Sequence, residues 1–144
     1  MKSIVVLNGP NLQRLGSREP DIYGTLDYES LVTLLEKQAS ELGVDLTVKQ
    51  SDSESVLISW LHEATDTGAD IIFNPAAFTH YSYAIADACK IHTESGAKLI
   101  EVHISNPHAR EEFRKTSVVS PAATGVIAGF GFDSYLLALR QLTS

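Results

Sequence analysis

The segment of residues 8–24, NGPNLQRLGSREPDIYG, concentrates side chains that bind anions and exchange protons. It carries two asparagines, two arginines and one tyrosine, and its two prolines stiffen the chain without supplying backbone N–H groups. An apolar run precedes it, and catalytic groups tend to lie on loops that follow a rigid strand. The length and charge of the segment favour a lid or binding loop, and a plain surface excursion is the alternative.

Four of the five arginines fall in two segments that are distant in the sequence. Arg14 and Arg18 belong to the first loop, whereas Arg110 and Arg114 lie in a second polar segment. If the two segments converge, they form a cationic pocket that suits a small anion such as a carboxylate. Scattered surface charge is the alternative interpretation.

Length and composition indicate a single globular domain. The 144 residues are 44% hydrophobic and 20% charged, which is enough to bury a core. A net charge of -7 argues against nucleic acid as a partner, because phosphates require a basic face. No apolar run reaches the length of a membrane span, and the apolar stretch near the start is too short for a signal peptide. We therefore expect a cytoplasmic protein that has no membrane contact.

Hydrophobic periodicity predicts strands that alternate with helices. Strands are expected at 4–7, 44–48, 71–73, 98–103 and 125–129, and helices at 26–42, 56–67, 82–94 and 135–142. This alternation implies a parallel sheet with helices on both faces, because parallel neighbours require right-handed crossovers. The predicted fold class is therefore α/β, with a flavodoxin-like five-stranded sheet in the order 2-1-3-4-5.

Local signals predict the ends and faces of these helices. One face of the first helix is expected to carry Leu31, Leu34, Leu35, Ala39 and Leu42. Gly43 and Gly68 are expected to end the first two helices, and Ser51 with Glu54 resembles a capping box ahead of the second. The single cysteine, Cys89, is expected to be buried and inert. Three histidines are expected at the surface: His62, His92 and His108.

Polar residues follow three of the predicted strands. They are Asn8 and Asn11 after the first strand, Asn74 and His80 after the third, and His103 and Ser105 after the fourth. In open parallel sheets, ligands bind beyond the carboxyl ends of the strands, at the switch point between strands 1 and 3. The sequence therefore predicts one site at this edge.

Several chemistries lack their motifs. Asn8 and Asn74 stand where a phosphoryl-accepting receiver domain needs acidic residues, and no phosphate-binding loop, dinucleotide fingerprint or serine nucleophile elbow occurs. His62 and Glu63 lack the second histidine of a zinc-protease motif, and no Cys/His pair has ligand spacing, so neither a metal nor a cofactor is expected. Acid–base chemistry by tyrosine, histidine and asparagine, steered by arginine, is the remaining class.

Four motifs are similar to those of type II 3-dehydroquinate dehydratases over nearly the whole chain. They are residues 8–24, QSDSE at 50–54, NPAAFTH at 74–80 and EVHISNPHAREEFR at 101–114. The flavodoxin-like fold of that family agrees with the sheet expected above. The resemblance implies a single catalytic domain over 1–144 that converts 3-dehydroquinate to 3-dehydroshikimate and water in the shikimate pathway.

The resemblance also implies how protons are transferred. Tyr23 is the general base, as tyrosinate, an enolate follows, and His103 is the general acid. Moving a tyrosine pKa from about 10 to about 7 requires roughly 4 kcal/mol, which one guanidinium at about 4 to 5 Å nearly supplies at an effective dielectric near 20. Arg18 is the matching cation, and Arg14 can add to its effect. Glu101 precedes His103 by two residues on the same strand face and can orient the imidazole.

Contacts to the substrate are implied in the same way. They are Asn74 with the backbone amides of Ile104 and Ser105 for the carboxylate, and His80, Ser105 and Arg114 for the ring hydroxyls. Asn11 is implied to stabilise the enolate through a bound water. Asp87 matches a residue that reaches into the site of a neighbouring subunit, which implies a homododecamer built as a tetramer of trimers.

The sequence departs from the family at Ala76, where glycine is frequent, and a Cβ there can alter the approach of the backbone to the substrate. Two alternatives stay open at this point. The pocket can serve another lyase or isomerase of a polyhydroxy carboxylic acid, or the protein can be a non-catalytic module that binds a small anion. A Schiff-base route to the same product is disfavoured, because it needs a lysine in a barrel of about 250 residues.

Overall fold

Five parallel strands form the centre of the structure, a computed structural model that describes residues 1–16 and 27–144. The strands are β1 (Ser3–Asn8), β2 (Asp45–Gln50), β3 (Asp70–Asn74), β4 (Leu99–His103) and β5 (Gly125–Ala128). Their order in the sheet is β2-β1-β3-β4-β5. The predicted α/β class and the flavodoxin-like order 2-1-3-4-5 are confirmed.

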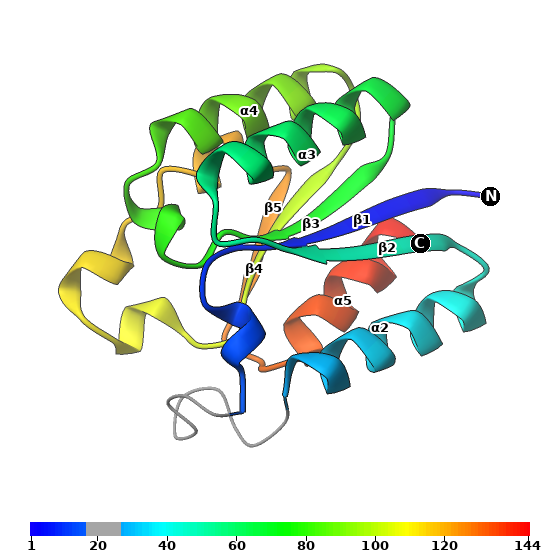
Figure 1. The fold of residues 1–144 in the computed structure, drawn as a ribbon, viewed down its shortest axis with the longest axis horizontal. Coiled ribbons are helices and arrows are strands. Elements are labelled where there is room, and N and C mark those ends of the chain that lie inside the picture. The colour runs from blue at the N-terminus through cyan, green and yellow to red at the C-terminus, as the bar shows by residue number, and fades with distance from the viewer. Residues whose placement is uncertain (17–26) are drawn as a thin grey trace.

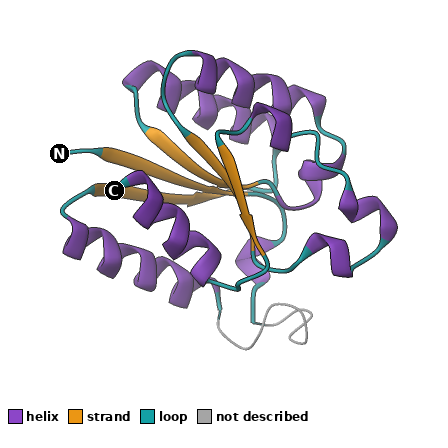
Figure 2. Ribbon diagram, turned by 180° about the vertical axis from the view of Figure 1, so that it is seen from behind, coloured by secondary structure: helices purple, strands orange, loops and turns teal. Residues whose placement is uncertain are grey.

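Within the described residues, four α-helices cover the two faces of this sheet. They are α2 (Tyr28–Leu42), α3 (Glu54–Thr67), α4 (Tyr83–Glu94) and α5 (Asp133–Leu142). The helices α3 and α4 lie on one face, and α2 and α5 lie on the other (Figures 1 and 2). Short 3-10 helices lie in the connections: η1 (Leu12–Arg14), η2 (Ala76–His80), η3 (Pro107–Ala109), η4 (Glu112–Lys115) and η5 (Ser120–Ala122). Within the described part of the chain, no helix is both long and apolar enough to cross a membrane.

The alternation of side chains along each strand divides the core into two layers. On β4, Ile100 and Val102 pack in the cluster that contains the buried faces of α2 and α5, whereas Leu99 packs in the cluster of α3 and α4. Since successive strand residues point to opposite faces, Glu101 and His103 share the α3/α4 face with Leu99. Polar side chains at the strand ends therefore leave the sheet in two directions.

Helix ends follow the local chemistry of the sequence. Gly43 and Gly68 end α2 and α3 with φ of 69° and 75°, a left-handed conformation that glycine adopts without a steric cost, as predicted. The predicted capping box is wrong. The N-cap of α3 is Ser53, whose Oγ accepts from the backbone N–H of Val56 at 3.3 Å, and Glu54 instead accepts a hydrogen bond from the hydroxyl of Ser82 at the start of α4.

Two predictions of burial need correction. On α2 the buried seam consists of Leu31, Leu35 and Ala39 at a spacing of four, and Leu34 and Leu42 are exposed. His92 was expected at the surface but is fully buried. It belongs to the inner face of α4 with Ile85, Ala88 and Cys89, and both of its ring nitrogens have polar partners. The expected burial of Cys89 is confirmed, and so is the exposure of His62 and His108.

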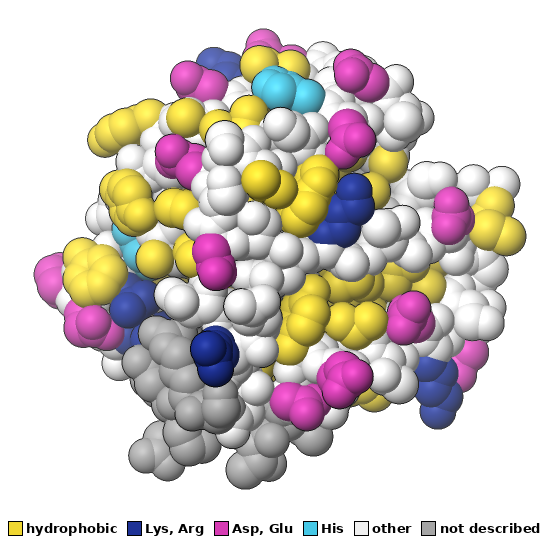
Figure 3. All heavy atoms as spheres, in the orientation of Figure 1, with side chains coloured by type: hydrophobic (Ala, Val, Ile, Leu, Met, Phe, Trp, Pro, Cys, Tyr) yellow, Lys and Arg dark blue, Asp and Glu magenta, His cyan; other side chains and the backbone are white. Residues whose placement is uncertain are grey.

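The surface view in Figure 3 agrees with the acidic composition. Acidic side chains are spread over this face, and lysine and arginine side chains are fewer. Large apolar side chains that are exposed include Tyr81, Tyr83, Phe113 and Phe130.

Candidate active site

Three strands end in polar side chains at the same edge of the sheet. Asn8, Asn74 and His103 are the last residues of β1, β3 and β4, and Asn8 is paired in register with Asn74. Parallel strands bring their carboxyl ends to one edge, so residues that are distant in sequence become neighbours. The site lies where strand order reverses between β1 and β3, as predicted.

The chain after β1 packs closely against the chain after β3. The backbone N–H of Gly9 donates to the carbonyl of Asn74 at 2.8 Å. A Cβ at position 9 would lie 2.5 Å from the carbonyl oxygen of Pro75, so only glycine permits this approach. The contact holds the first loop and η2 against each other at the rim of the site.

The side chain of Asn74 is fixed at both ends. Its Nδ2 donates to the hydroxyl of Tyr135 at 2.8 Å, and this hydroxyl donates to Oδ1 of Asn8 at 2.7 Å. Its Oδ1 accepts from the backbone N–H of Ala76 at 3.1 Å. Ala76 has a φ of 53°, in the left-handed region that is costly for a residue with a Cβ. The amide orientation of Asn74 therefore depends on α5 and on a strained turn.

His103 is held by a buried carboxylate on the same face of the sheet. Its Nε2 lies 2.5 Å from Oε2 of Glu101, which confirms the predicted pairing. Glu101 is 1% exposed and also accepts hydrogen bonds from the hydroxyls of Ser117 and Ser120. Burial opposes ionisation, but the hydrogen bond and charge of His103 and the two serine donors outweigh it and hold the pKa of Glu101 below its usual value. Because Nε2 faces the carboxylate, Nδ1 is the nitrogen that can exchange a proton with a ligand.

His80, at the end of η2, is oriented by the segment that follows η4. Its Nδ1 donates to the carbonyl of Thr116 at 2.8 Å, and its ring meets Phe113 edge-on at 5.5 Å. Burial lowers the pKa of His80; the Thr116 carbonyl opposes this effect, and the positive charge of Arg114 adds to it. The imidazole is therefore biased toward its neutral form, which can both donate and accept a hydrogen bond.

Two arginines enter the pocket from the segment after β4. Arg114 is paired with Glu111 at 3.0 Å, and its guanidinium lies 4.7 Å from the ring centroid of Phe113. Arg110 donates from Nη1 to Oγ of Ser105 at 3.3 Å. Arg110 was noted in the sequence as part of a second basic segment, but it was not assigned to the site. Its spacing of four from Arg114 was the available signal.

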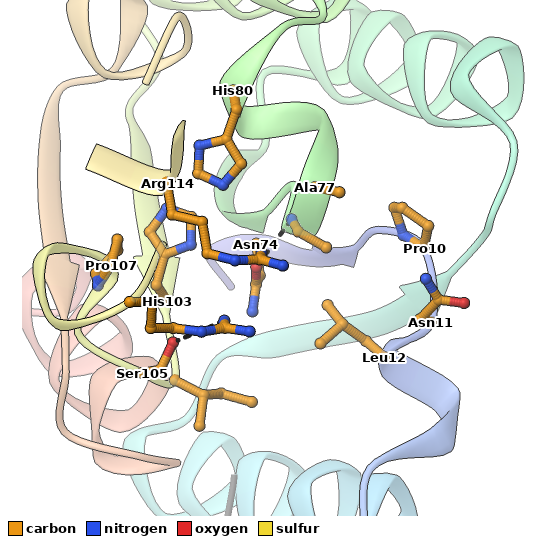
Figure 4. Close-up of a pocket in the computed structure, with 13 residues that line it drawn as sticks. Pro10, Asn11, Leu12, Asn74, Ala77, His80, His103, Ser105, Pro107 and Arg114 are labelled. Carbon is orange, nitrogen blue, oxygen red and sulfur yellow. Dashed lines mark hydrogen bonds between the residues drawn. The ribbon is translucent and has the colours of Figure 1, made fainter. Parts of the chain in front are cut away.

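One pocket unites most of the predicted residues, as Figure 4 shows. Its lining includes Asn11, Asn74, His80, His103, Ile104, Ser105 and Arg114. Arg110 and Ala76 line it as well. In Figure 4 the side chains of His80, His103 and Arg114 come from one side, and Asn11 and Leu12 come from the other.

The remaining predicted residues lie elsewhere. Asp87 is exposed on α4 and is not part of this lining. Tyr23 and Arg18 lie outside the described residues. Arg14, in η1, is exposed. Among residues 1–16 and 27–144, no group of three or more His, Cys, Asp or Glu side chains could hold a metal ion.

Sequence reasoning missed three residues that support the site. Tyr135 was predicted only as part of the apolar face of the last helix, yet its hydroxyl contacts both Asn8 and Asn74. Ser117 and Ser120 lie in an irregular segment without periodicity, and their role depends on contacts to Glu101, which is 16 and 19 residues away. Ser117 and Ser120 flank Val118 and Val119, and this short stretch of sequence gave no local signal of their contacts with Glu101.

Comparisons with known proteins find similar chains. Residues 2–143 match the model of the family described as dehydroquinase class II. The chain is 54% identical over 141 residues to a 3-dehydroquinate dehydratase of Salinispora tropica, which covers 98% of this chain and 96% of that protein. It is 56% identical over 137 residues to the enzyme of the same name from Mycobacterium tuberculosis, which covers 95% and 91%.

Solved structures are similar over the same length. A crystal structure of a type II dehydroquinase from Propionibacterium acnes has a TM-score of 0.95 and 52% sequence identity, and covers 99% of this chain and 97% of that one. Family model, relatives and structure all span nearly the whole chain, and the chain belongs to the class II dehydroquinase family.

Proposed function

We propose that this protein is a 3-dehydroquinate dehydratase, a hydro-lyase that converts 3-dehydroquinate to 3-dehydroshikimate and water in the shikimate pathway. The observation that carries the proposal is a pocket in which His103, held by Glu101, lies with Asn74 and Arg114 in a chain of this family. The reaction transfers protons and no electrons to an acceptor, so the chemistry requires no redox cofactor.

The substrate is a β-hydroxy ketone, and its elimination requires a base and an acid. The base removes the proton next to the ketone, and an enolate forms. The C–O bond then breaks, and its electrons stay with the oxygen, which takes a proton from the acid and leaves as water. We assign the acid to His103, because its Nδ1 can transfer a proton while Nε2 remains on the Glu101 carboxylate.

We assign the base to Tyr23, on the first loop and outside the described residues, with Arg18 as the cation that stabilises the tyrosinate. Asn11 is the candidate for stabilising the enolate through a bound water. A hydrogen-bond network fixes the backbone of Asn11. Its N–H donates to Oδ1 of Asp52 at 2.9 Å, and the side-chain amide of Gln50 donates to the same oxygen at 3.0 Å.

We assign the substrate carboxylate to Asn74 and to the backbone amides of Ile104 and Ser105, which line the pocket together. The ring hydroxyls are assigned to His80, Ser105 and Arg114. Carboxylate binding at this place is supported by the presence of both Arg110 and Arg114 in the lining of the pocket, in an otherwise acidic protein. A neutral His80 suits a hydroxyl, because its Nδ1–H donates to the carbonyl of Thr116 and its Nε2 can accept a hydrogen bond.

The assembly is part of the proposal. Asp87 lies on the exposed side of α4, where it can reach a second subunit, and a homododecamer of four trimers is the predicted state. A cytoplasmic location and a single catalytic domain over 1–144 also stay predictions. The native mass in solution tests the assembly: a fully active monomer would contradict it.

The direct experiment is to incubate the purified protein with 3-dehydroquinate and to follow the conjugated enone of the product by ultraviolet absorbance. His103→Gln is the matched control, because it should bind the substrate but transfer no proton to the leaving hydroxyl. A different product from a polyhydroxy acid would indicate another lyase or isomerase. Binding of 3-dehydroquinate without turnover would indicate a non-catalytic module, and either result rejects the proposal.

A further inference from the structure

The segment of residues 116–120 contacts His80 directly, and it contacts Glu101, the residue that holds His103. The contacts are Thr116 O with His80 Nδ1 at 2.8 Å, Val118 N with Thr79 O at 2.8 Å, and the hydroxyls of Ser117 and Ser120 with the Glu101 carboxylate. The roles assigned above for substrate binding and proton transfer do not include these two hydroxyls. Their contact with Glu101 therefore points to a role in the site.

The carboxylate of Glu101 is buried but fully paired. Ser120 donates to Oε1 at 2.7 Å, Ser117 lies 3.2 Å from both oxygens, and Oε2 faces Nε2 of His103. An ionised carboxylate only accepts hydrogen bonds, and donors on both oxygens stabilise that form. Burial of the same charge without donors would favour a protonated carboxyl group instead.

Other titratable and charged groups also face this carboxylate. They are Cys89 of α4, His80 of η2, His108 of η3, and Arg114 and Lys115 of η4. Burial, with a smaller contribution from the charge of Glu101, raises the pKa of Cys89 to about 12, so the thiol adds no charge. Arg114 and Lys115 of η4 line a cavity with Glu101, Ser117 and Ser120, but they are ion-paired with Glu111 and Glu112.

We propose that Ser117 and Ser120 are positioning residues that keep Glu101 ionised and directed at His103, so that His103 presents its proton to the pocket. The inference rests on the proposed dehydratase function, in which His103 is the acid. When the substrate C–O bond breaks, the leaving oxygen takes the proton from Nδ1 of His103. The other proton remains on Nε2, which stays hydrogen-bonded to the Glu101 carboxylate. The serines are not part of the lining of the candidate pocket, and they act through the Glu101 carboxylate.

Ser120→Ala is the clearest test, because Ser117 also accepts backbone hydrogen bonds from Val119 and Ser120 and so shapes the turn. Loss of one donor to a charged acceptor should raise the pKa of Glu101 and move the acid limb of kcat/KM upward by about 0.5 to 1 pH unit. We expect kcat near neutral pH to fall about 3- to 10-fold and KM to change less than about 2-fold.

Two control variants separate this effect from a loosened segment. Ser120→Thr retains the hydroxyl and should keep the wild-type acid limb. Thr93→Val removes a hydrogen bond of 2.9 Å from α4 to the carbonyl of Ala122, which ties down the same segment without touching Glu101. It should leave the pH profile unshifted. An unshifted profile in Ser120→Ala, or an equal shift in Thr93→Val, would overturn the proposal.

A second readout does not depend on activity. The Glu101 pKa is lowered in the folded protein, so the carboxylate stabilises the fold above its unfolded pKa, and this stability is lost as pH falls through the folded pKa. In Ser120→Ala the folded pKa of Glu101 moves toward the unfolded value, so less stability should be lost as pH falls, and the loss should be complete at a higher pH than in wild type. Thermal unfolding midpoints from pH 7 to 4 measure this difference. If the wild type does not turn over 3-dehydroquinate, the proposed function fails. If wild type and Ser120→Ala have identical unfolding midpoints at every pH, only the proposed role of the serines is rejected.

Discussion

The hydroxyl of Tyr135 accepts a hydrogen bond from the side-chain amide of Asn74 at 2.8 Å, although 61 residues separate them. The same hydroxyl donates to Oδ1 of Asn8 at 2.7 Å, so one buried tyrosine joins the ends of β1 and β3 to α5. Tyr135 is 0% exposed. The residue assigned to the substrate carboxylate is therefore oriented from beneath the sheet, by a helix near the end of the chain.

Tyr135→Phe should destabilise the protein by about 1 to 3 kcal/mol, because it removes the hydroxyl partner of the buried Asn74 Nδ2 and Asn8 Oδ1 atoms while removing little volume. Denaturant unfolding measures the loss of free energy. Tyr83→Phe is the matched control, since Tyr83 is 73% exposed, and it should change stability by less than about 0.5 kcal/mol. Equal stability of the two variants would contradict a structural role for this hydroxyl.

The turn after Asn74 predicts opposite effects for glycine at two adjacent positions. Ala76 has a φ of 53°, whereas Ala77 is not among the described residues with positive φ. Ala76→Gly removes the strain of a left-handed residue but adds unfolded-state entropy, so we expect a net gain of about 0.5 kcal/mol in stability. Ala77→Gly has only the entropic cost and should lose about 0.5 to 1 kcal/mol.

The difference in sign between these two variants is the test, and it is measured by denaturant unfolding under identical conditions. A loss of stability in both would show that the Cβ of Ala76 contributes packing that outweighs its backbone strain. Since the N–H of Ala76 binds Oδ1 of Asn74, Ala76→Gly should also change the KM for 3-dehydroquinate more than kcat.

Much of the fold was predictable because its signals are local and repeat along the chain. The apolar run at 71–73 predicted a buried strand, and the alternation at 44–48 predicted another strand. The crossover rule then indicated a parallel sheet, for which the flavodoxin-like order is natural at this chain length. The helical spacing of Ile85, Ala88, Cys89 and His92 also contained the signal that His92 is buried. That signal was overlooked because histidine was treated as polar, whereas here Thr65 and Lys98 satisfy both ring nitrogens.

The candidate site was predictable only in part. Residues at strand ends, such as Asn74 and His103, follow from the rule that ligands bind at the carboxyl edge of the sheet. The supporting contacts of Tyr135, Ser117 and Ser120 depend on side chains that are distant in sequence, and no periodic pattern encodes such pairs. The strand spacing of Glu101 and His103 is the exception, since two residues on one strand face must be neighbours.

The buried imidazole of His92 predicts loss of stability on the acid side. Burial lowers its pKa; the Lys98 carbonyl and Asp70 oppose this, so the fold favours the neutral ring. An unfolded histidine titrates near pH 6.5, and below that pH the unfolded chain binds more protons than the folded one. The stabilisation is thus present above about pH 6.5 and is lost as pH falls.

Thermal unfolding midpoints between pH 7.5 and 5 should therefore fall, and the slope should be smaller in His92→Gln. His62→Gln is the control, because His62 is exposed on α3 and should leave the slope unchanged. The pKa of His80 is also lowered, so His80 makes the unfolding midpoint fall with pH in the same direction. The slope of His92→Gln is therefore compared with that of wild type and of His62→Gln. Glu101 contributes only at lower pH, since its pKa lies below the usual carboxyl value. An unchanged slope in His92→Gln would show that the buried ring is not linked to folding.

Arg110 lines the pocket, although the sequence assigned it no role in substrate binding. Its Nη1 donates to Oγ of Ser105, a residue assigned to the substrate. A guanidinium near a carboxylate or hydroxyl contributes about 1.5 to 3 kcal/mol, so Arg110→Gln should lower kcat/KM by at least about 10-fold, mainly through KM. Arg110→Lys keeps the charge but loses the planar fork, and should recover only part of the loss.

Arg140→Gln is the control variant. It removes the same charge from an exposed position on α5, and it should leave kcat and KM within about 2-fold of wild type. Steady-state kinetics of the three variants decide between local binding and general electrostatic attraction: equal losses in Arg110→Gln and Arg140→Gln would show that only the net charge of the protein matters.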